Sequence, residues 1–199
     1  MAEIPAISDV PFGSPDIIRE LKLAVDTLAG RIGGNVDYGT IDGVRTKVLD
    51  IVHLCNMGRI KARAYRNAAQ NIDAGPGSAT KVLIDTISRD TESVIDIANS
   101  RIIPNLPGDY VVMGNVVASD VPDGLMVNAV IYKNGVWASY GTFDNQGATG
   151  HSSSSASDLI YMNGTTDYLE LYAYNSDSTA LTLYTGYSYQ NYISILGPF

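Results

Sequence analysis

Hydrophobic and polar positions follow two different periods along this chain of 199 residues. Up to about residue 58, apolar residues recur every three or four positions, which is the period of a helix with one buried face. Further on, short runs of alternating apolar and polar residues are separated by Gly, Asn and Asp, which is the pattern of strands and turns. The change predicts an N-terminal segment over 1–58 and a β domain over 59–199.

The N-terminal segment is expected to be an extended arm followed by short α-helices. Pro5 and Pro11 disfavour regular structure in the arm. Ser14 and Pro15 suit the N-cap and first turn of a helix that Gly30 can end. A second helical stretch, rich in β-branched residues, is expected near residues 44–56.

One stripe of the first helix is apolar and consists of Ile18, Leu21, Val25 and Leu28. These side chains either pack against the rest of their own chain or form a short coiled-coil seam between subunits. Two heptads are too few to distinguish the two arrangements from sequence.

Eight segments of the β domain have strand-like patterns, and many short strands at close intervals predict a sandwich or a barrel. They cover residues 82–84, 94–98, 110–118, 125–132, 157–162, 168–174, 181–184 and 192–196. Asn134-Gly135, Asn163-Gly164 and Asp123-Gly124 tolerate positive φ and predict tight turns. The segment from Gly147 to Ser155, with four consecutive serines, is expected to be an exposed loop.

Composition narrows the range of functions. Hydrophobic residues make up 45% of the chain and charged residues 17%, which is enough apolar material for a packed core. The net charge of −8 argues against a nucleic-acid partner, because phosphate binding needs clustered Lys and Arg. No apolar run approaches the roughly 18 residues of a membrane span, and Met1–Pro5 lacks the features of a signal peptide. Synthesis in a cytoplasm without membrane insertion is therefore expected.

The chain lacks the residue patterns that are typical of the common catalytic sites. The single cysteine, Cys55, excludes an intramolecular disulfide and a metal site built on several thiolates. Neither His53 nor His151 lies in a pattern typical of a Ser-His-Asp triad, and the chain has no phosphate-binding loop or dinucleotide motif. These observations favour a protein without enzymatic activity or cofactor.

The C-terminal half of the chain is strongly acidic. From residue 102 on, Lys133 is the one basic residue against eight acidic ones. Asp120 and Asp123 could form half of a calcium site, since calcium prefers loop carboxylates and carbonyls. A solvated acidic surface is the favoured interpretation, because no complete ligand loop of the EF-hand kind is present.

Tyrosine is concentrated near the end of the chain, where seven of the thirteen tyrosines lie between residues 168 and 192. The alternation over 168–174 places a leucine face toward the core and a tyrosine strip outward, formed by Tyr168, Tyr172 and Tyr174. Exposed aromatic strips mark subunit interfaces or stacking platforms for sugars. A subunit interface is favoured, because large amphipathic aromatic residues are enriched there.

Four short motifs of the β domain occur in the order and at the spacing of a known family. They are Arg63-Ala64-Tyr65-Arg66 with Gln70, Asn99–Pro104 leading to Pro107–Tyr110, Val130–Gly135, and Thr166–Tyr174. On these motifs, residues 62–199 resemble the C1q/TNF-like jelly-roll family, in the form often attached to bacteriophage structural proteins. The aromatic closing strand of that family is replaced here by Tyr192–Leu196, and the preceding residues contain no collagen-like repeat.

The resemblance implies a mainly β fold, with a C-terminal jelly-roll sandwich preceded by the arm and the short helices. It also implies a homotrimer in which a strip such as Tyr168, Tyr172 and Tyr174 packs at the threefold axis. The implied function is that of a structural protein of a phage virion, made in the host bacterial cytoplasm and acting as a tail-fibre or tail-tip component.

Two further sites are expected in the N-terminal segment and in the polar loop, since binding residues concentrate on loops and such arms commonly order on a partner surface. The helix stripe would attach the trimer to other phage structural proteins, and the polar loop with Asn145, Gln146, His151 and Ser152 would contact a host cell-surface receptor. A capsid decoration protein that stabilises the shell is the alternative. A glycan-binding or glycan-degrading module is the third hypothesis.

Overall fold

The fold was determined as a computed structural model, which describes residues 58–75, 79–142, 149–187 and 189–199. Gly58–Phe199 form one compact unit. The arm, the two helices and the stripe from Ile18 to Leu28 lie outside the described residues. None of the described residues belongs to a helix that is long and apolar enough to cross a membrane.

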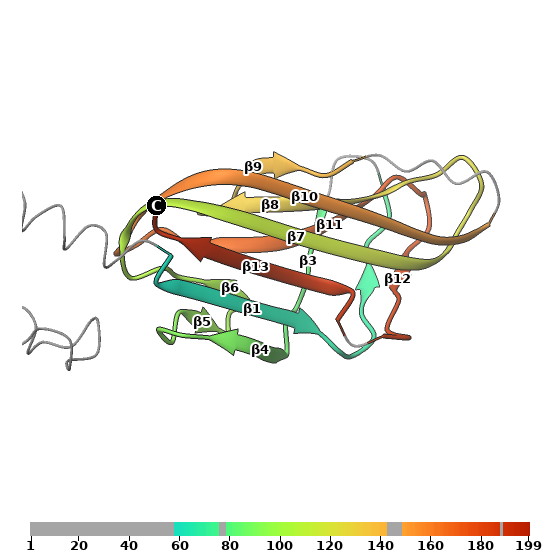
Figure 1. The fold of residues 1–199 in the computed structure, drawn as a ribbon. Helices are drawn as coiled ribbons and strands as arrows, with labels where there is room; N and C mark the ends of the chain where they lie inside the picture. The colour runs from blue at the N-terminus through green and yellow to red at the C-terminus, as the bar shows by residue number, and fades with distance from the viewer. Residues whose placement is uncertain (1–57, 76–78, 143–148, 188) are drawn as a thin grey trace, which may run out of the picture. The chain divides into compact units, whose positions relative to one another are not determined.

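Two β-sheets face each other in the described part of the chain (Figure 1). Sheet A has the order β2 (Asn71–Ile72), β12 (Leu181–Leu183), β7 (Pro107–Val121), β13 (Asn191–Gly197), β1 (Ile60–Arg66) and β4 (Thr86–Asp90). β12 and β13 pair with different stretches of β7, and β10 (Gly150–Asn163) pairs with β7 as an additional strand. Sheet B has the order β5 (Ile95–Asp96), β6 (Arg101–Ile102), β11 (Leu169–Asn175), β8 (Val127–Lys133) and β9 (Val136–Tyr140), with β3 (Ala79–Lys81) also paired to β11. The expected all-β sandwich is confirmed.

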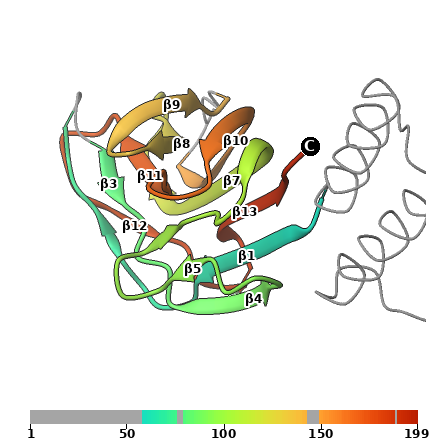
Figure 2. The same cartoon turned by 90° about the vertical axis from the view of Figure 1, so that its left-hand side faces the viewer.

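The core lies between the two sheets, as the end-on view shows (Figure 2). Tyr110 and Val112 of β7 are fully buried against the other sheet's Ile131, Leu169 and Leu171. Each such side chain contributes roughly 1.5–3 kcal/mol when it leaves water. Alternation along β10 and much of β7 turns one apolar face of sheet A inward, whereas β8 in sheet B is buried from Val127 to Tyr132.

The turns follow the expected chemistry. Asn134 and Gly135 have φ values of 54° and 75°, so both occupy the left-handed region that a two-residue hairpin turn between β8 and β9 requires. Gly124 and Gly164 also have positive φ, at 77° and 73°. The tight turns expected at these three places are present.

The serine-rich segment is a strand, so the loop expected from Gly147 to Ser155 is wrong for residues 150–155. These residues begin β10, which pairs antiparallel with β7 from Gly150 opposite Val121 onward. Ser152 and Ser154 point inward and are fully buried. Ser154 Oγ accepts a hydrogen bond from Ala129 N at 3.0 Å and donates one to Thr142 O at 2.9 Å, so this small polar side chain replaces an apolar one without leaving its hydroxyl unpaired.

One expected strand is also misplaced. Residues 82–84 are not part of a ladder, because β3 ends at Lys81 and β4 begins at Thr86. Val82 and Ile84 are nevertheless buried in the core. Their apolar character therefore indicates burial and not a strand, because a residue in a loop between two short strands can be buried as well.

The two ends of the sandwich differ. Gly58 N donates to Pro198 O at 2.6 Å and Phe199 N donates to Asp109 O at 3.0 Å, so the start and the end of the described domain lie together at one end, here called the proximal end. Val121 and Gly150 pair at the other end of β7, here called the distal end. The 15 residues of β7 separate the two ends by roughly 45 Å, at a rise of about 3.3 Å per residue.

Candidate interaction surfaces

The outward face of sheet A carries an apolar row near the proximal end. Leu159 of β10 is opposite Val111 of β7, and Val111 is opposite Leu196 of β13, so the three side chains lie side by side on one face. Leu159 is 59% exposed and Leu196 is 37% exposed. Tyr161 and Met113 continue the row on either side and are exposed as well. A contiguous apolar patch of this kind on a sheet face indicates a contact with another molecule.

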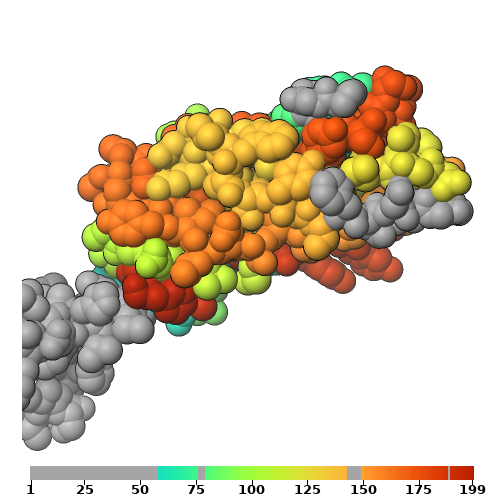
Figure 3. All heavy atoms as spheres, turned by 90° about the horizontal axis from the view of Figure 1, so that it is seen from above, coloured from blue at the N-terminus to red at the C-terminus, as the bar shows by residue number. Residues whose placement is uncertain are grey.

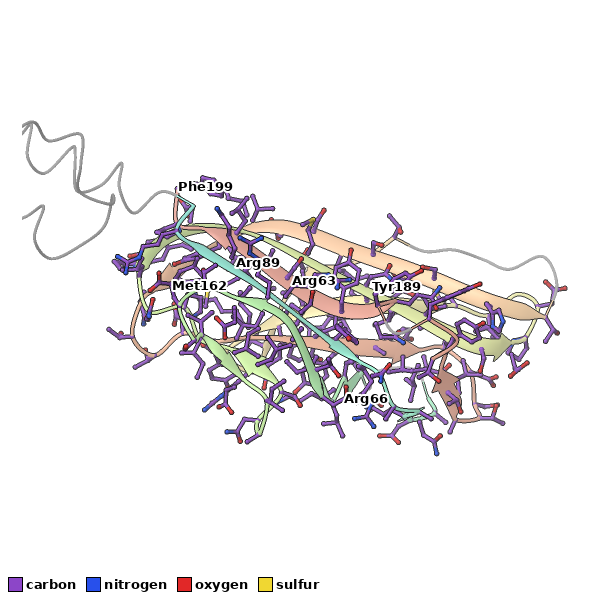
Figure 4. The ribbon with its side chains drawn as sticks, turned by 60° about the horizontal axis from the view of Figure 1, so that its bottom comes forward. Arg63, Arg66, Arg89, Met162, Tyr189 and Phe199 are labelled. Atoms are coloured by element: carbon purple, nitrogen blue, oxygen red, sulfur yellow. The ribbon has the colours of Figure 1, made fainter. Side chains whose placement is uncertain are left out.

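A shallow depression lies beside this row, on the same face of sheet A. It is lined by Lys61, Ala62, Arg63, Arg89, Met113, Ser194, Ile195 and Leu196. The sheet register explains why residues from four strands lie together here. Arg89 is opposite Arg63, Arg63 is opposite Ser194, and Ser194 is opposite Met113. The rim of the depression is therefore cationic and its floor is apolar. Figure 4 shows Arg63 and Arg89 on this side of the sandwich.

Arg63 is held in place by aromatic neighbours. Its guanidinium lies 4.3 Å from the ring centroid of Tyr192, and Nη2 donates to Tyr189 O at 3.0 Å. A guanidinium over a tyrosine ring gains electrostatic attraction from the ring quadrupole. The side chain is thus oriented along the sheet, with its charge kept at the surface.

The expected tyrosine strip lies on the outward face of sheet B. Leu169, Leu171 and Ala173 are buried, while Tyr168, Tyr172 and Tyr174 are partly exposed, as the alternation predicts. The three rings do not stand free. Tyr172 stacks on Tyr132 with centroids 3.9 Å apart, Tyr174 lies 6.2 Å from Tyr140, and Arg101 lies 5.2 Å from the ring of Tyr168.

The β8–β9 hairpin extends this aromatic cluster, and it occupies the middle of the face seen in Figure 3. Trp137 contacts Tyr132 edge-on at 6.0 Å, and its indole nitrogen donates to the Tyr132 hydroxyl. Burial raises the pKa of Tyr132 and of Tyr172, and the nearby carboxylate of Glu170 raises both further. Both phenols therefore stay protonated and able to donate hydrogen bonds. Much of the apolar area of the tyrosine strip is therefore covered by neighbouring side chains of the same chain.

The candidate receptor residues lie near the distal end or outside the described part. Asn145 and Gln146 belong to residues 143–148, which are not described. His151 is exposed on β10, with its ring 4.1 Å from that of Tyr184. Ser152 is the next residue on the strand and is fully buried, so it is not available for contact with a receptor. Of these four candidate residues, His151 is therefore the one that the structure describes as exposed.

The described residues offer no cluster of three or more His, Cys, Asp or Glu side chains that could hold a metal ion. Asp120 and Asp123 are both exposed at the distal end, next to the β7–β8 turn. Asp120 has a positive φ of 54°, as expected for a residue at the end of a long strand that turns sharply. The calcium half-site remains a sequence-based expectation without a third ligand among the described residues.

The cationic depression was not anticipated from the sequence. Lys61 and Arg63 are two positions apart, which is the period of one strand face, and this signal was present. Arg89 joins them only because β4 pairs with β1 across residues 67–85, which contain β2 and β3. That pairing has no local sequence signature.

Comparisons with known proteins bear on the fold. No family model and no curated protein matches the chain. Among solved structures, murine APRIL at pH 5.0 matches with a TM-score of 0.52 at 9% identity, covering 69% of this chain and 98% of that one. Eiger TNF from S. frugiperda matches with a TM-score of 0.51 at 10% identity, covering 72% and 94%. The globular domain of zebrafish complement 1qA matches with a TM-score of 0.46 at 8% identity, covering 70% and 98%.

The APRIL and Eiger matches show that the described domain has the jelly-roll fold of the C1q/TNF kind. The expected resemblance is confirmed at the level of the fold. At such low identity the likeness concerns the fold alone, because one fold serves many functions.

Proposed function

We propose that the chain is a non-enzymatic, homotrimeric structural protein of a bacteriophage virion. The exposed apolar row on the outward face of sheet A is the observation that carries the trimer. Leu159, Val111 and Leu196 with Met113 and Tyr161 form a patch that isolated soluble domains rarely expose. A homotrimer is also what the resemblance to the C1q/TNF-like family implies.

The tyrosine strip is the other surface considered for this contact. Its rings already pack on Tyr132, Tyr140 and Arg101, so less apolar area is gained by covering them with a second molecule. In the row on sheet A, Lys133 lies 6.0 Å from the centroid of the Tyr161 ring, but the aliphatic side chains of Leu159, Met113 and Leu196 stay exposed. Since the gain from burial is about 25 cal/mol per Å² of apolar area, sheet A is the stronger candidate for the subunit interface.

The arrangement of the two ends supports attachment at one and display at the other. Gly58, where the N-terminal segment joins the domain, lies at the proximal end beside Pro198. The distal end, with the β7–β8 turn and His151, is roughly 45 Å away by the length of β7. An N-terminal segment anchored in the particle would therefore leave the distal end free to contact the host, as in a tail fibre or tail tip.

Immunogold labelling of this protein on intact particles tests the proposal. Label on the tail supports the tail-fibre or tail-tip role, and label on the head supports the alternative of a capsid decoration protein. Absence of the protein from purified particles would contradict a virion role of either kind. Deleting residues 1–13 in the full chain adds a second test: the trimer should persist while incorporation into particles is lost.

A further inference from the structure

The outward face of sheet B carries one connected set of aromatic rings. The ring centroid of Trp137 lies 6.0 Å from that of Tyr132 and 5.5 Å from that of Tyr140. Tyr132 stacks on Tyr172 at 3.9 Å, and Tyr140 lies 6.2 Å from Tyr174. These five side chains come from the adjacent strands β9, β8 and β11. The set, here called the aromatic platform, therefore follows the surface of sheet B across three strands (Figure 3).

Packing within the aromatic platform holds the rings in place. The indole nitrogen of Trp137 donates to the Tyr132 hydroxyl, and Tyr132 in turn stacks on Tyr172. Rings that are already fixed lose little conformational freedom when a ligand stacks on them, which lowers the cost of binding. Burial raises the pKa of Tyr140, and the phenols of Tyr174 and Tyr132 raise it further, so its hydroxyl stays protonated and able to donate. The platform thus combines apolar ring faces with hydrogen-bonding hydroxyls.

The charged side chains that flank the platform neutralise one another. Glu170 is opposite Tyr132 and Lys81 is opposite Tyr172, and Lys81 Nζ lies 2.5 Å from Glu170 Oε1. Two further ion pairs involve strands of sheet B, namely Arg101 with Asp96 and Lys133 with Asp167. An anion would also be repelled by a chain whose net charge is −8. These charges favour an uncharged ligand over a charged one.

The size of the platform indicates a small ligand. An aromatic side chain has about 150–250 Å² of surface. Trp137 is 48% exposed and the other four side chains are less exposed, so the ring surface open to solvent stays below about 500 Å². A stable contact between two proteins takes about 800 Å² from each partner. The platform is therefore too small for a protein interface of ordinary size, but it can hold a few sugar rings.

The platform stays accessible in the proposed assembly. The proposed subunit interface lies on the outward face of sheet A, and the platform lies on the opposite side of the sandwich (Figure 2). A homotrimer would thus present three copies of the platform on its outside. Three equal sites on one particle component turn a weak contact with a repeating ligand into a stronger one.

We propose that the aromatic platform binds an uncharged glycan, with one face of a pyranose ring lying on Trp137 and an adjacent sugar extending toward Tyr140. The C–H bonds on a pyranose face are weakly positive and are attracted to the negative face of an aromatic ring. The sugar hydroxyls lie at the edge of the pyranose, where the phenol hydroxyls of the platform can bond them. The inference rests on the proposed function for the origin of the glycan on the host surface, and it adds a contact on the flank of the domain to the distal one.

Fluorescence of the full chain tests the proposal directly, because Trp137 is the single tryptophan of the sequence. The probes are uncharged tetrasaccharides of glucose, galactose, mannose and N-acetylglucosamine at millimolar concentration, with tetragalacturonate as an acidic comparison. At least one uncharged probe should move the emission to shorter wavelength in a saturable way, since a stacked sugar displaces water from the indole. No change with any uncharged probe would overturn the proposal, and so would tighter binding of tetragalacturonate.

Variants locate the binding, with calorimetry as the readout. Trp137→Ala should weaken binding of the active probe by at least about tenfold. Trp137→Phe keeps a ring at this place and should retain most of the affinity, which separates lost stacking from a damaged fold. Tyr187→Ala is the matched control, because Tyr187 is an exposed ring in the connection between β12 and β13 of sheet A. Affinity that is unchanged in Trp137→Ala would overturn the assignment.

The two proposals fail separately. If the chain is a trimer on intact particles but binds none of the uncharged probes, the glycan site is overturned and the proposed function stands. If the chain binds a probe through Trp137 but is monomeric or absent from particles, the proposed function is contradicted and the glycan site stands.

Discussion

The side-chain amide of Asn134 donates a hydrogen bond of 2.8 Å to Asp167 Oδ1 and thereby joins the β8–β9 turn to the loop between β10 and β11. Asp167 Oδ2 also accepts from Asn163 N at 3.0 Å and lies 2.9 Å from Lys133 Nζ. The hydrogen bond from Asn134, followed by that from Lys133, holds the pKa of Asp167 below its ordinary value of 3.8. One carboxylate therefore ties the β8–β9 turn to the end of β10 at the proximal end.

Replacing Asp167 by Ala should lower the free energy of unfolding by about 1–3 kcal/mol, because the donors of Asn134 and Asn163 lose their partner. A depressed pKa means that this stabilisation is present above pH 3.8 and is lost as the pH falls through the lower pKa of the folded state. Urea unfolding of wild type and variant near neutral pH and near about pH 2 checks both parts. A difference between the two proteins that stays constant over this range would contradict the assignment, and Asp123→Ala is the exposed control.

Gly114 of β7 lies directly under Leu171 of β11, and a Cβ at this glycine would be 2.7 Å from Leu171 Cδ1. Gly114→Ala should therefore cost about 1–3 kcal/mol by overpacking the core. Leu171→Val removes the atom that interferes, so the double variant should be more stable than the sum of the two single losses predicts. Strict additivity in urea unfolding would mean that the two sites do not touch.

Tyr110 is fully buried, and burial raises its pKa to about 12. Its hydroxyl donates to Leu106 O at 2.8 Å. Because the unfolded tyrosine ionises near pH 10, the wild type should lose stability as the pH rises from about 10 to 12. Tyr110→Phe should be about 1 kcal/mol less stable at neutral pH, since the carbonyl loses its donor, and should lose less stability over the alkaline range. Denaturant midpoints of the two proteins at neutral pH and near pH 11 measure this.

The two outward faces should respond differently to truncation. Tyr172→Ala removes the ring that stacks on Tyr132 and should destabilise sheet B by about 2 kcal/mol without changing the oligomeric state. Leu159→Ser on sheet A should weaken subunit association with little effect on the fold, because this side chain is 59% exposed in the single chain. Dissociation by Tyr172→Ala with an intact trimer in Leu159→Ser would place the interface on the tyrosine strip instead.

The sequence predicts those features of the fold that have local causes. The Asn134-Gly135 turn follows from the need for positive φ, and the inward leucines and outward tyrosines of β11 follow from a period of two. The serines at 152 and 154 misled the prediction, because their polarity indicates exposure. Both are buried in a strand, where Ser154 finds its hydrogen-bond partners on Ala129 and Thr142.

The candidate surfaces were predicted less well, for a topological reason. The tyrosine strip lies on one strand and could be read from its alternation. The cationic depression combines Lys61 and Arg63 with Arg89 from a neighbouring strand, and the apolar row combines residues 111, 159 and 196. Residues that lie side by side across a sheet are brought together by which strands pair and in what register. Pairing between strands far apart in the sequence cannot be predicted from a short window of sequence.

The central claim is that the chain forms a homotrimer through the outward face of sheet A, and its mass in solution tests that claim most directly. Sedimentation equilibrium of the full chain at micromolar concentration should give about 64 kDa, three times the 21.3 kDa of one chain. A single species of 21.3 kDa across that concentration range would contradict the trimer and, with it, the role proposed for the apolar row.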